Sequence, residues 1–163
     1  MTDSARDRIA VIIGSGAMGV AAARRFGPAC HLLVADNSQA RLEAAVRSLT
    51  DDGHHVEAMT VDVRDGEAVA AVAAAAGRAG TVMAVIHTAG VSPGQGSARD
   101  IFAINLVGTA HVIGEAGIRG AEVEEADAQQ LAGRRGGQFV FKCRVDTLLV
   151  PRHAGHADQR GAR

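Results

Sequence analysis

Short apolar runs alternate with longer amphipathic segments over the first two-thirds of the chain. Four runs rich in Val, Ile, Leu and Ala have the length of buried parallel strands, and they span residues 8–13, 31–35, 56–61 and 82–86. Each run is followed by a segment with helical character, at residues 20–26, 38–50, 65–77 and 97–112. This alternation with short connections predicts a parallel sheet with helices on both faces.

The predicted fold class is α/β, a Rossmann-type doubly wound sheet in three αβα layers. Right-handed crossovers place the four strands in the order 3-2-1-4, with a crevice between strands 1 and 4. We expect this domain to cover residues 1–114. The pattern changes beyond Gly114. Residues 115–150 are expected to extend the same domain, with room for a fifth strand, and residues 151–163 to form a disordered tail.

A glycine-rich loop joins the first strand to the first helix. Gly14, Gly16 and Gly19 form a GxGxxG sequence between a strand and a helix, which is the context in which this motif binds a dinucleotide. The first glycine permits a tight turn, the second lets the backbone approach a pyrophosphate, and the third lets the helix pack closely. Ser15 and Met18 complete the predicted phosphate loop, and the alternative is a structural turn without a ligand.

An acidic residue stands at the end of the second strand. The Asp36 carboxylate can bind both ribose hydroxyls of NAD at this position. It would repel a 2′-phosphate unless a basic side chain intervened, and Arg41 is the nearest candidate. The sequence therefore predicts that NAD is favoured over NADP. The alternative is a solvated carboxylate without a ligand.

Composition limits the classes of binding partner and indicates the cellular compartment. The formal net charge of −1 gives no electrostatic basis for binding nucleic acid or an anionic membrane. No apolar run approaches the roughly 20 residues of a membrane helix, and the polar N-terminus does not resemble a signal peptide. Cys30 and Cys143 form no CxxC pair. We expect a cytoplasmic protein with reduced thiols, while nothing in the sequence supports a homo-oligomer.

Four motifs together resemble the short-chain dehydrogenase/reductase family. They are the glycine loop, Asp62-Val63, Thr88-Ala89-Gly90 and Asn105-Leu106-Val107-Gly108-Thr109, and the resemblance covers roughly residues 8–114. It implies an NAD(P)-dependent oxidoreductase with a small-molecule substrate that the sequence does not identify.

The same resemblance implies roles for individual residues. Asp62 and Val63 would contact the adenine ring, and Ala89 and Gly90 would line the nicotinamide ribose. Asn105 would be the asparagine of a catalytic tetrad that also contains Ser, Tyr and Lys.

Several departures from the family pattern affect the chemistry. The glycine loop is one residue shorter than the family's TGxxxGxG, and Thr88 replaces the first residue of an Asn-Ala-Gly motif. The family uses a Tyr, acidified by a Lys four residues later, for proton transfer. The chain contains no Tyr, and its single Lys, Lys142, follows Gln138 at that spacing. Cys143 takes the place of the catalytic Ser if the segment 137–143 is the family's fifth strand.

Three interpretations of the function are compatible with the sequence. The chain is the cofactor-binding half of an oxidoreductase whose catalytic half is missing, through truncation or a reading-frame change near residue 114. Alternatively, it is a non-catalytic NAD-binding module that acts through a partner, or an enzyme that uses another group such as His87 or Cys143. More often a histidine at the end of a strand, like His87, is a core-edge residue. No metal site is expected, because His153 and His156 have no third ligand in view.

Overall fold

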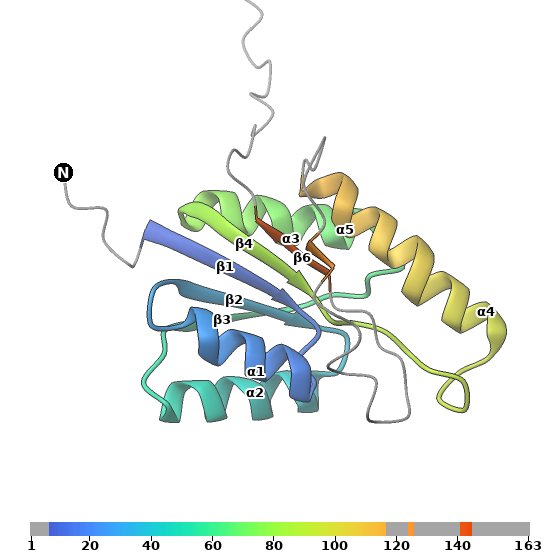
Figure 1. The fold of residues 1–163 in the computed structure, drawn as a ribbon, viewed down its shortest axis with the longest axis horizontal. Helices are drawn as coiled ribbons and strands as arrows, with labels where there is room; N and C mark the ends of the chain where they lie inside the picture. Colours follow the sequence, from blue (N-terminus) through green and yellow to red (C-terminus); the bar gives the residue numbers. More distant parts are fainter. Residues whose placement is uncertain (1–6, 117–123, 126–140, 145–163) are drawn as a thin grey trace, which may run out of the picture.

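The apolar runs form the centre of a parallel sheet. The computed structural model describes residues 7–116, 124–125 and 141–144. Its parallel strands are β1 (Arg8–Ile13), β2 (His31–Asp36), β3 (Val56–Thr60) and β4 (Thr81–His87). They lie in the order β3-β2-β1-β4 (Figure 1), which confirms the predicted fold class and crossover topology.

Helices cover both faces of this sheet. Figure 1 shows α1 (Ala17–Phe26) and α2 (Gln39–Asp51) together on one face, and α3 (Gly66–Ala79) with α5 (Thr109–Glu115) on the other. Side chains alternate between the faces along each strand, so every central strand contributes to two cores. Ile12, Leu32 and Leu49 pack in the first core, whereas Val11 and Val72 pack in the second.

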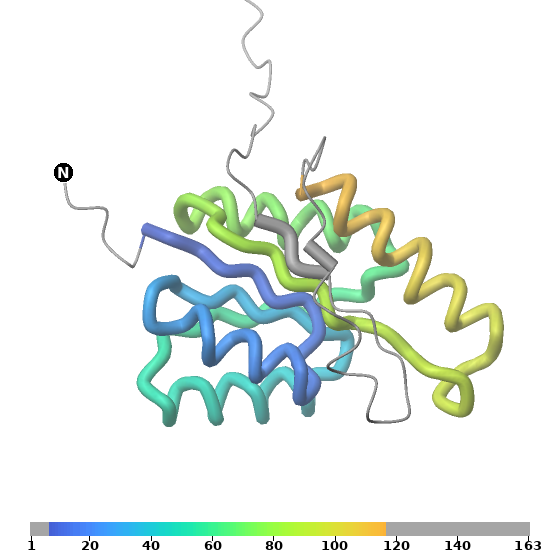
Figure 2. Tube along the Cα trace, in the orientation of Figure 1, coloured from blue at the N-terminus to red at the C-terminus, as the bar shows by residue number. Residues whose placement is uncertain are grey.

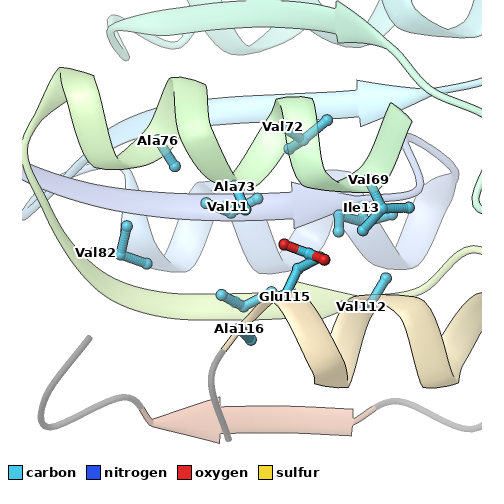
Figure 3. A pocket seen from close by; sticks show the side chains of 11 residues that line it. Val11, Ile13, Val69, Val72, Ala73, Ala76, Val82, Val112, Glu115 and Ala116 are labelled. Atoms are coloured by element: carbon cyan, nitrogen blue, oxygen red, sulfur yellow. The ribbon is translucent and has the colours of Figure 1, made fainter. Parts of the chain in front are cut away.

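The second core contains a small apolar cavity of about 30 Å³ between α3, α5 and the sheet (Figure 3). Its lining is almost entirely Val, Ile and Ala, with Glu115 at the C-terminal end of α5 as a charged member. The small side chains of the alanine-rich α3 leave this space unfilled. A volume of this size holds no more than one or two water molecules.

Capping side chains mark the starts of α2 and α3, while the first helix starts earlier and the third ends later than predicted. Ser38 caps α2 and Asp65 caps α3. The Asp65 side chain accepts hydrogen bonds from two backbone amides in the first turn of α3. The first helix begins at Ala17 instead of residue 20, because its first hydrogen bond runs from the Val20 N–H to the Gly16 carbonyl. The third helix runs through Gly77 to Ala79.

The fourth predicted helix is continuous but not uniformly α-helical. A short α4 (Ala98–Ile101), which starts at a capping box of Ser97 and Asp100, leads into a π-helical segment (Phe102–Gly108) and then into α5. Gly108 lies against Val63, and a β-carbon there would come within 2.6 Å of the valine side chain. The glycine therefore lets this helix pack closely on the segment after β3.

The fifth strand differs from the one that the resemblance implies. Two short strands, β6 (Phe141–Arg144) and β5 (Glu124–Glu125), extend the sheet beyond β4, and β6 pairs antiparallel with β4. Cys143 is paired with Val85, in the middle of β4. The placement of Cys143 at the carboxyl edge of a parallel strand is therefore wrong for this structure. The predicted tail, with His153 and His156, lies outside the described residues.

The turn after β1 and the segment after β4 lie at the same end of the sheet (Figure 2). The Thr88 and Ala89 amides donate to the Ile13 carbonyl at 2.7 and 3.0 Å. In the described part of the chain, no helix is both long and apolar enough to span a membrane.

Candidate functional site

A cleft of about 410 Å³ opens at the carboxyl ends of the parallel strands. It is lined by the loop after β1, the end of β2, the segment after β3 and the segment after β4. Seven of the predicted cofactor residues are part of this lining, namely Gly14, Gly16, Asp36, Asp62, Val63, Ala89 and Gly90. Ser15, Met18 and Gly19 belong to the same loop and helix start but do not line the cleft.

The three loop glycines have different surroundings. Gly14 has φ +104°, and a β-carbon there would lie 2.6 Å from both the Ala89 nitrogen and the Thr88 hydroxyl oxygen. A β-carbon at Gly19 would collide with the Gly14 carbonyl, so α1 packs directly on the turn. No atom lies within 4 Å of the β-carbon position of Gly16. Gly14 and Gly19 are thus required by the protein's own packing, whereas the space at Gly16 is open to a ligand.

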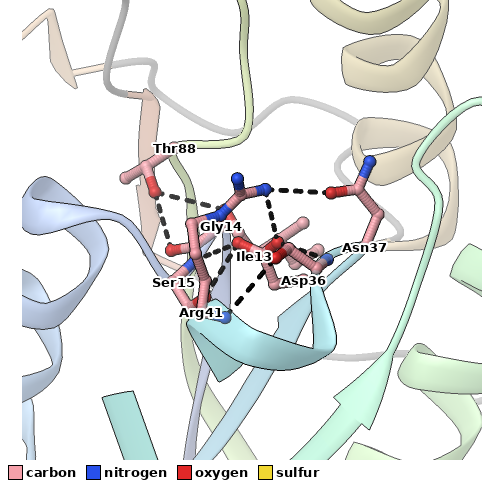
Figure 4. Close-up of polar contacts among 8 residues, drawn as sticks. Ile13, Gly14, Ser15, Asp36, Asn37, Arg41 and Thr88 are labelled. Atoms are coloured by element: carbon pink, nitrogen blue, oxygen red, sulfur yellow. Dashed lines mark hydrogen bonds and ion pairs between the residues drawn. The ribbon is translucent and has the colours of Figure 1, made fainter. Parts of the chain in front are cut away.

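Thr88 ties the end of β4 to the glycine loop (Figure 4). Its buried hydroxyl lies 3.0 Å from the Gly14 carbonyl oxygen and 3.3 Å from that of Ile13. The threonine that departs from the family's Asn-Ala-Gly pattern therefore has a definite role, because it holds the turn at Gly14 in place.

Asp36 is buried at the end of β2 and accepts four hydrogen bonds (Figure 4). The Ser15 N–H and hydroxyl donate to Oδ2 at 2.7 and 2.8 Å. The Ser38 N–H and the Arg41 guanidinium donate to Oδ1 at 2.8 and 2.9 Å. Burial alone would raise the pKa of this carboxyl, but the bonds from Ser15, Ser38 and Arg41 outweigh it and lower the pKa below its usual value. Asp36 is therefore ionised at neutral pH.

The second carboxylate of the cleft, Asp62, also forms an ion pair with an arginine. Arg64 binds it through both Nε and Nη2, at 3.0 and 2.6 Å, in the bidentate geometry typical of guanidinium–carboxylate pairs. Hydrogen bonds from the Arg64 side chain lower the pKa of Asp62, with burial acting in the opposite direction. The two acidic side chains of the cleft are thus both paired with a cation.

Asn105 lies in the π-helical segment, beside the segment that follows β4. Its side-chain amide donates to the Val91 carbonyl at 2.8 Å and accepts from the Val91 N–H at 2.9 Å. Both ends of the amide are occupied, and Asn105 is not among the lining residues of the cleft. This side chain holds the loop after Gly90 against the helix, and its catalytic role remains a prediction.

His87 is buried between the end of β4 and α5 and does not line the cleft. The Thr109 hydroxyl donates its proton to the Asn105 carbonyl at 2.6 Å, so it can only accept from His87 Nε2 at 3.2 Å. Nδ1 of His87 is the one buried side-chain polar atom without a partner among the described residues. Burial lowers the pKa of His87 to about 4. The expected core-edge position is confirmed, but only one ring nitrogen has a hydrogen-bond partner.

Sequence reasoning missed part of the cleft wall. Val91 and Gln95 from the loop after β4, and Ile104 from the π-helical segment, also line the cleft. This loop has no apolar periodicity that would fix its path. The polar, glycine-containing stretch directly after Thr88-Ala89-Gly90 was the available signal, because a loop that follows a strand at this edge faces the crevice.

Comparison with known proteins agrees with this geometry. A family model described as short chain dehydrogenase matches residues 8–117. The short-chain dehydrogenase/reductase bsc3 of Alternaria brassicicola is 39% identical over 107 residues, which are 66% of this chain and 39% of bsc3.

Solved structures share the fold of the described residues. A short-chain dehydrogenase/reductase from Burkholderia phymatum in complex with NAD is similar with a TM-score of 0.56 at 31% identity, over 68% of this chain and 43% of that one. A variant of the actinorhodin polyketide ketoreductase with NADPH gives a TM-score of 0.61 at 23% identity, over 69% and 47% of the two chains, which shows likeness of fold alone.

The chain spans less than half the length of these three relatives. The family match nevertheless covers most of this chain, including the strands, the glycine loop and the segments that line the cleft. The chain belongs to the short-chain dehydrogenase/reductase family.

Proposed function

We propose that this chain is the cofactor-binding part of an NAD(P)-dependent oxidoreductase and that it prefers NAD. The observation that carries the proposal is the cleft itself, in which the open position at Gly16 faces the same space as the Asp36 carboxylate. Its family binds NAD(P). A bound nicotinamide would supply hydride transfer, and the chain's own residues would hold and orient the dinucleotide.

The fit of a dinucleotide follows from the order of groups along the cleft. A pyrophosphate can approach the backbone at Gly16, next to the N-terminal amides of α1. Asp36 stands at the end of the neighbouring strand, where an adenosine ribose would lie. By resemblance, Asp62 and Val63 would border the adenine, and Ala89 and Gly90 the nicotinamide ribose.

The preference for NAD is supported by the charge of Asp36. Its lowered pKa keeps the carboxylate ionised at neutral pH, so a 2′-phosphate placed beside it meets repulsion, whereas a ribose hydroxyl can donate to it in place of one of its present partners.

The test is titration of the purified chain with NADH and NADPH, followed by nicotinamide fluorescence. We expect tighter binding of NADH in the wild type and a smaller difference between the cofactors in Asp36→Ala. Asp36→Asn, which keeps the shape of the side chain and removes the charge, separates loss of charge from loss of packing. Equal affinity of the wild type for both cofactors would contradict the proposed preference.

A second candidate is a non-catalytic NAD-binding module that acts through a partner. The observation that favours it is the complete absence of Tyr from the 163 residues, which leaves the chain without the family's usual proton-transfer group. Sequencing of the neighbouring reading frames separates the two candidates. A Tyr-x-x-x-Lys helix encoded there supports the oxidoreductase, and its absence supports the module.

A further inference from the structure

The Asp36 carboxylate has no free position for a new donor. An ionised carboxylate offers about four acceptor sites on its two oxygens. Ser15 supplies two donors to Oδ2, and Ser38 and Arg41 supply one each to Oδ1. A ribose hydroxyl that donates to Asp36 must therefore displace one of these partners.

Arg41 is the partner that can leave at least cost. The two backbone amides are fixed, one by the turn of the glycine loop and the other by the start of α2. The Ser15 hydroxyl is buried, whereas the Arg41 side chain is 59% exposed. The guanidinium is already largely in water and remains solvated when it leaves, and the buried Asp36 carboxylate keeps its other three hydrogen bonds.

A displaced Arg41 stays at the rim of the cleft. Its guanidinium also donates to the Asn37 side chain at 3.0 Å, and both residues line the cleft beside Asp36. The cation therefore remains close to the group that Asp36 binds. Guanidinium pairs well with phosphate, because its fork of N–H donors matches the phosphate oxygens.

We propose that Arg41 sets the balance between NAD and NADP in this chain, by competing with the ribose hydroxyls for Oδ1 of Asp36 and by pairing with a 2′-phosphate once it is displaced. The inference rests on the proposed binding of a dinucleotide in this cleft. The chain thus discriminates against NADP less strongly than a buried aspartate alone would.

The competing explanation is that Arg41 only ties the start of α2 to β2. The chain offers a matched pair for comparison, because Arg24 binds Asp52 at 2.7 Å and Ser48 at 2.9 Å on the exposed side of α1 and α2. Arg24 is not among the residues that line the cleft. Arg24→Gln therefore removes an arginine–aspartate pair from the same helix layer without touching the site, although Asp52 is more exposed than Asp36.

The experiment measures dissociation constants of wild type, Arg41→Gln, Arg41→Lys and Arg24→Gln by calorimetry at low ionic strength. The ligands are NADH and NADPH, with 5′-AMP and adenosine 2′,5′-bisphosphate as fragments that isolate the 2′-phosphate. In Arg41→Gln, we expect NADH to bind as well as before or better and NADPH to bind more weakly. The ratio of the NADPH to the NADH dissociation constant should rise at least tenfold. The affinity for adenosine 2′,5′-bisphosphate should fall relative to that for 5′-AMP.

Arg41→Lys, which retains a positive charge, should restore part of the affinity for the 2′-phosphate, and Arg24→Gln should leave the ratio as in the wild type. An unchanged ratio in Arg41→Gln, or an equal loss of affinity for both cofactors, would overturn the role of Arg41 and support a structural pair. A wild type that binds none of the four ligands would instead overturn the proposed function. The two failures are therefore distinguishable.

Discussion

Gly14, Gly16 and Gly19 belong to one sequence motif, but the structure separates the glycines required for folding from the one available to a ligand. The positive φ of Gly14 and the contact of Gly19 with the turn make a side chain unacceptable at either position. Gly16 has extended backbone with φ −70° and no neighbour at its β-carbon position. A side chain at Gly16 therefore disturbs only what enters the cleft.

Gly16→Val should separate binding from stability. The branched side chain would occupy the space through which a pyrophosphate approaches the backbone. We expect NADH affinity to fall at least about thirtyfold, equivalent to about 2 kcal/mol, in calorimetric titrations. The melting temperature should stay close to that of the wild type, since no atom beyond the neighbouring residues lies within 4 Å of the β-carbon position of Gly16.

Gly14→Val is the companion variant, and it should lower the melting temperature by many degrees because of its positive φ and its contacts with Thr88 and Ala89. If Gly16→Val leaves NADH affinity unchanged, the loop is a structural turn and no phosphate site.

At the scale of elements, the contact between β4 and α5 depends on a neutral histidine. The unfolded chain binds a proton on His87 near the ordinary pKa of 6.5, whereas the folded chain does so only at about 4. Above pH 6.5 the ring is neutral in both states, so the stability of the fold is undiminished there. Between these two values the unfolded state alone gains a proton, so stability falls as the pH falls.

The free energy of unfolding should therefore decrease by about 3 kcal/mol between pH 7 and pH 4 through His87. Urea unfolding followed by circular dichroism over this range measures the slope. His87→Gln should flatten the slope, even if the variant is less stable throughout, whereas replacement of the exposed His55 by Gln should not. A His87→Gln variant with the wild-type slope would assign the pH dependence to other groups.

The elements themselves could be predicted because each strand is a short apolar run between polar breaks. Strand order followed from the handedness of the crossovers, and the starts of α2 and α3 from the capping side chains Ser38 and Asp65. The π-helical segment around Asn105 could not be predicted, because one additional residue in a helical turn changes its apolar periodicity too little to detect. The antiparallel direction of β6 was equally inaccessible, since an isolated apolar run carries no information on direction.

The candidate site was predictable where a backbone requirement marks the sequence. Glycines at Gly14, Gly16 and Gly19, and an acid at the end of the second strand, stand out for this reason. The contacts of Thr88 with the turn, and the position of Arg41 on Asp36, depend on the angle at which neighbouring elements pack. Such angles are set by the whole core, so these contacts became visible only in three dimensions.

At the scale of the whole molecule, we expect cofactor binding without catalysis. Hydride transfer to a carbonyl leaves an alkoxide that needs a nearby acid, and a positioned acid contributes typically ~10²–10⁴-fold. The 163 residues contain no Tyr, and His87 is buried outside the cleft with a lowered pKa. The chain therefore has cofactor-site geometry without the family's proton donor.

The purified 163-residue chain should consequently show no appreciable NAD-dependent turnover of alcohols or ketones. A broad substrate screen that follows NADH absorbance measures this, with a full-length family member as the positive control. Robust turnover that persists in Cys143→Ala and His87→Ala would contradict the expected inactivity. Turnover abolished by one of these changes would identify an acid other than the family's.

The bond from Thr88 to the glycine loop has a consequence for the order of folding. The Thr88 hydroxyl and the Gly14 carbonyl are separated by 74 residues, so the turn of the loop reaches its final shape only after β4 has docked beside β1. Such long-range contacts form late, because the intervening chain must first lose its entropy. During synthesis, the glycine loop would leave the ribosome before β4, so it cannot make this bond until β4 has also emerged. The turn of the glycine loop is thus synthesised before β4 but reaches its final shape only after β4 has docked.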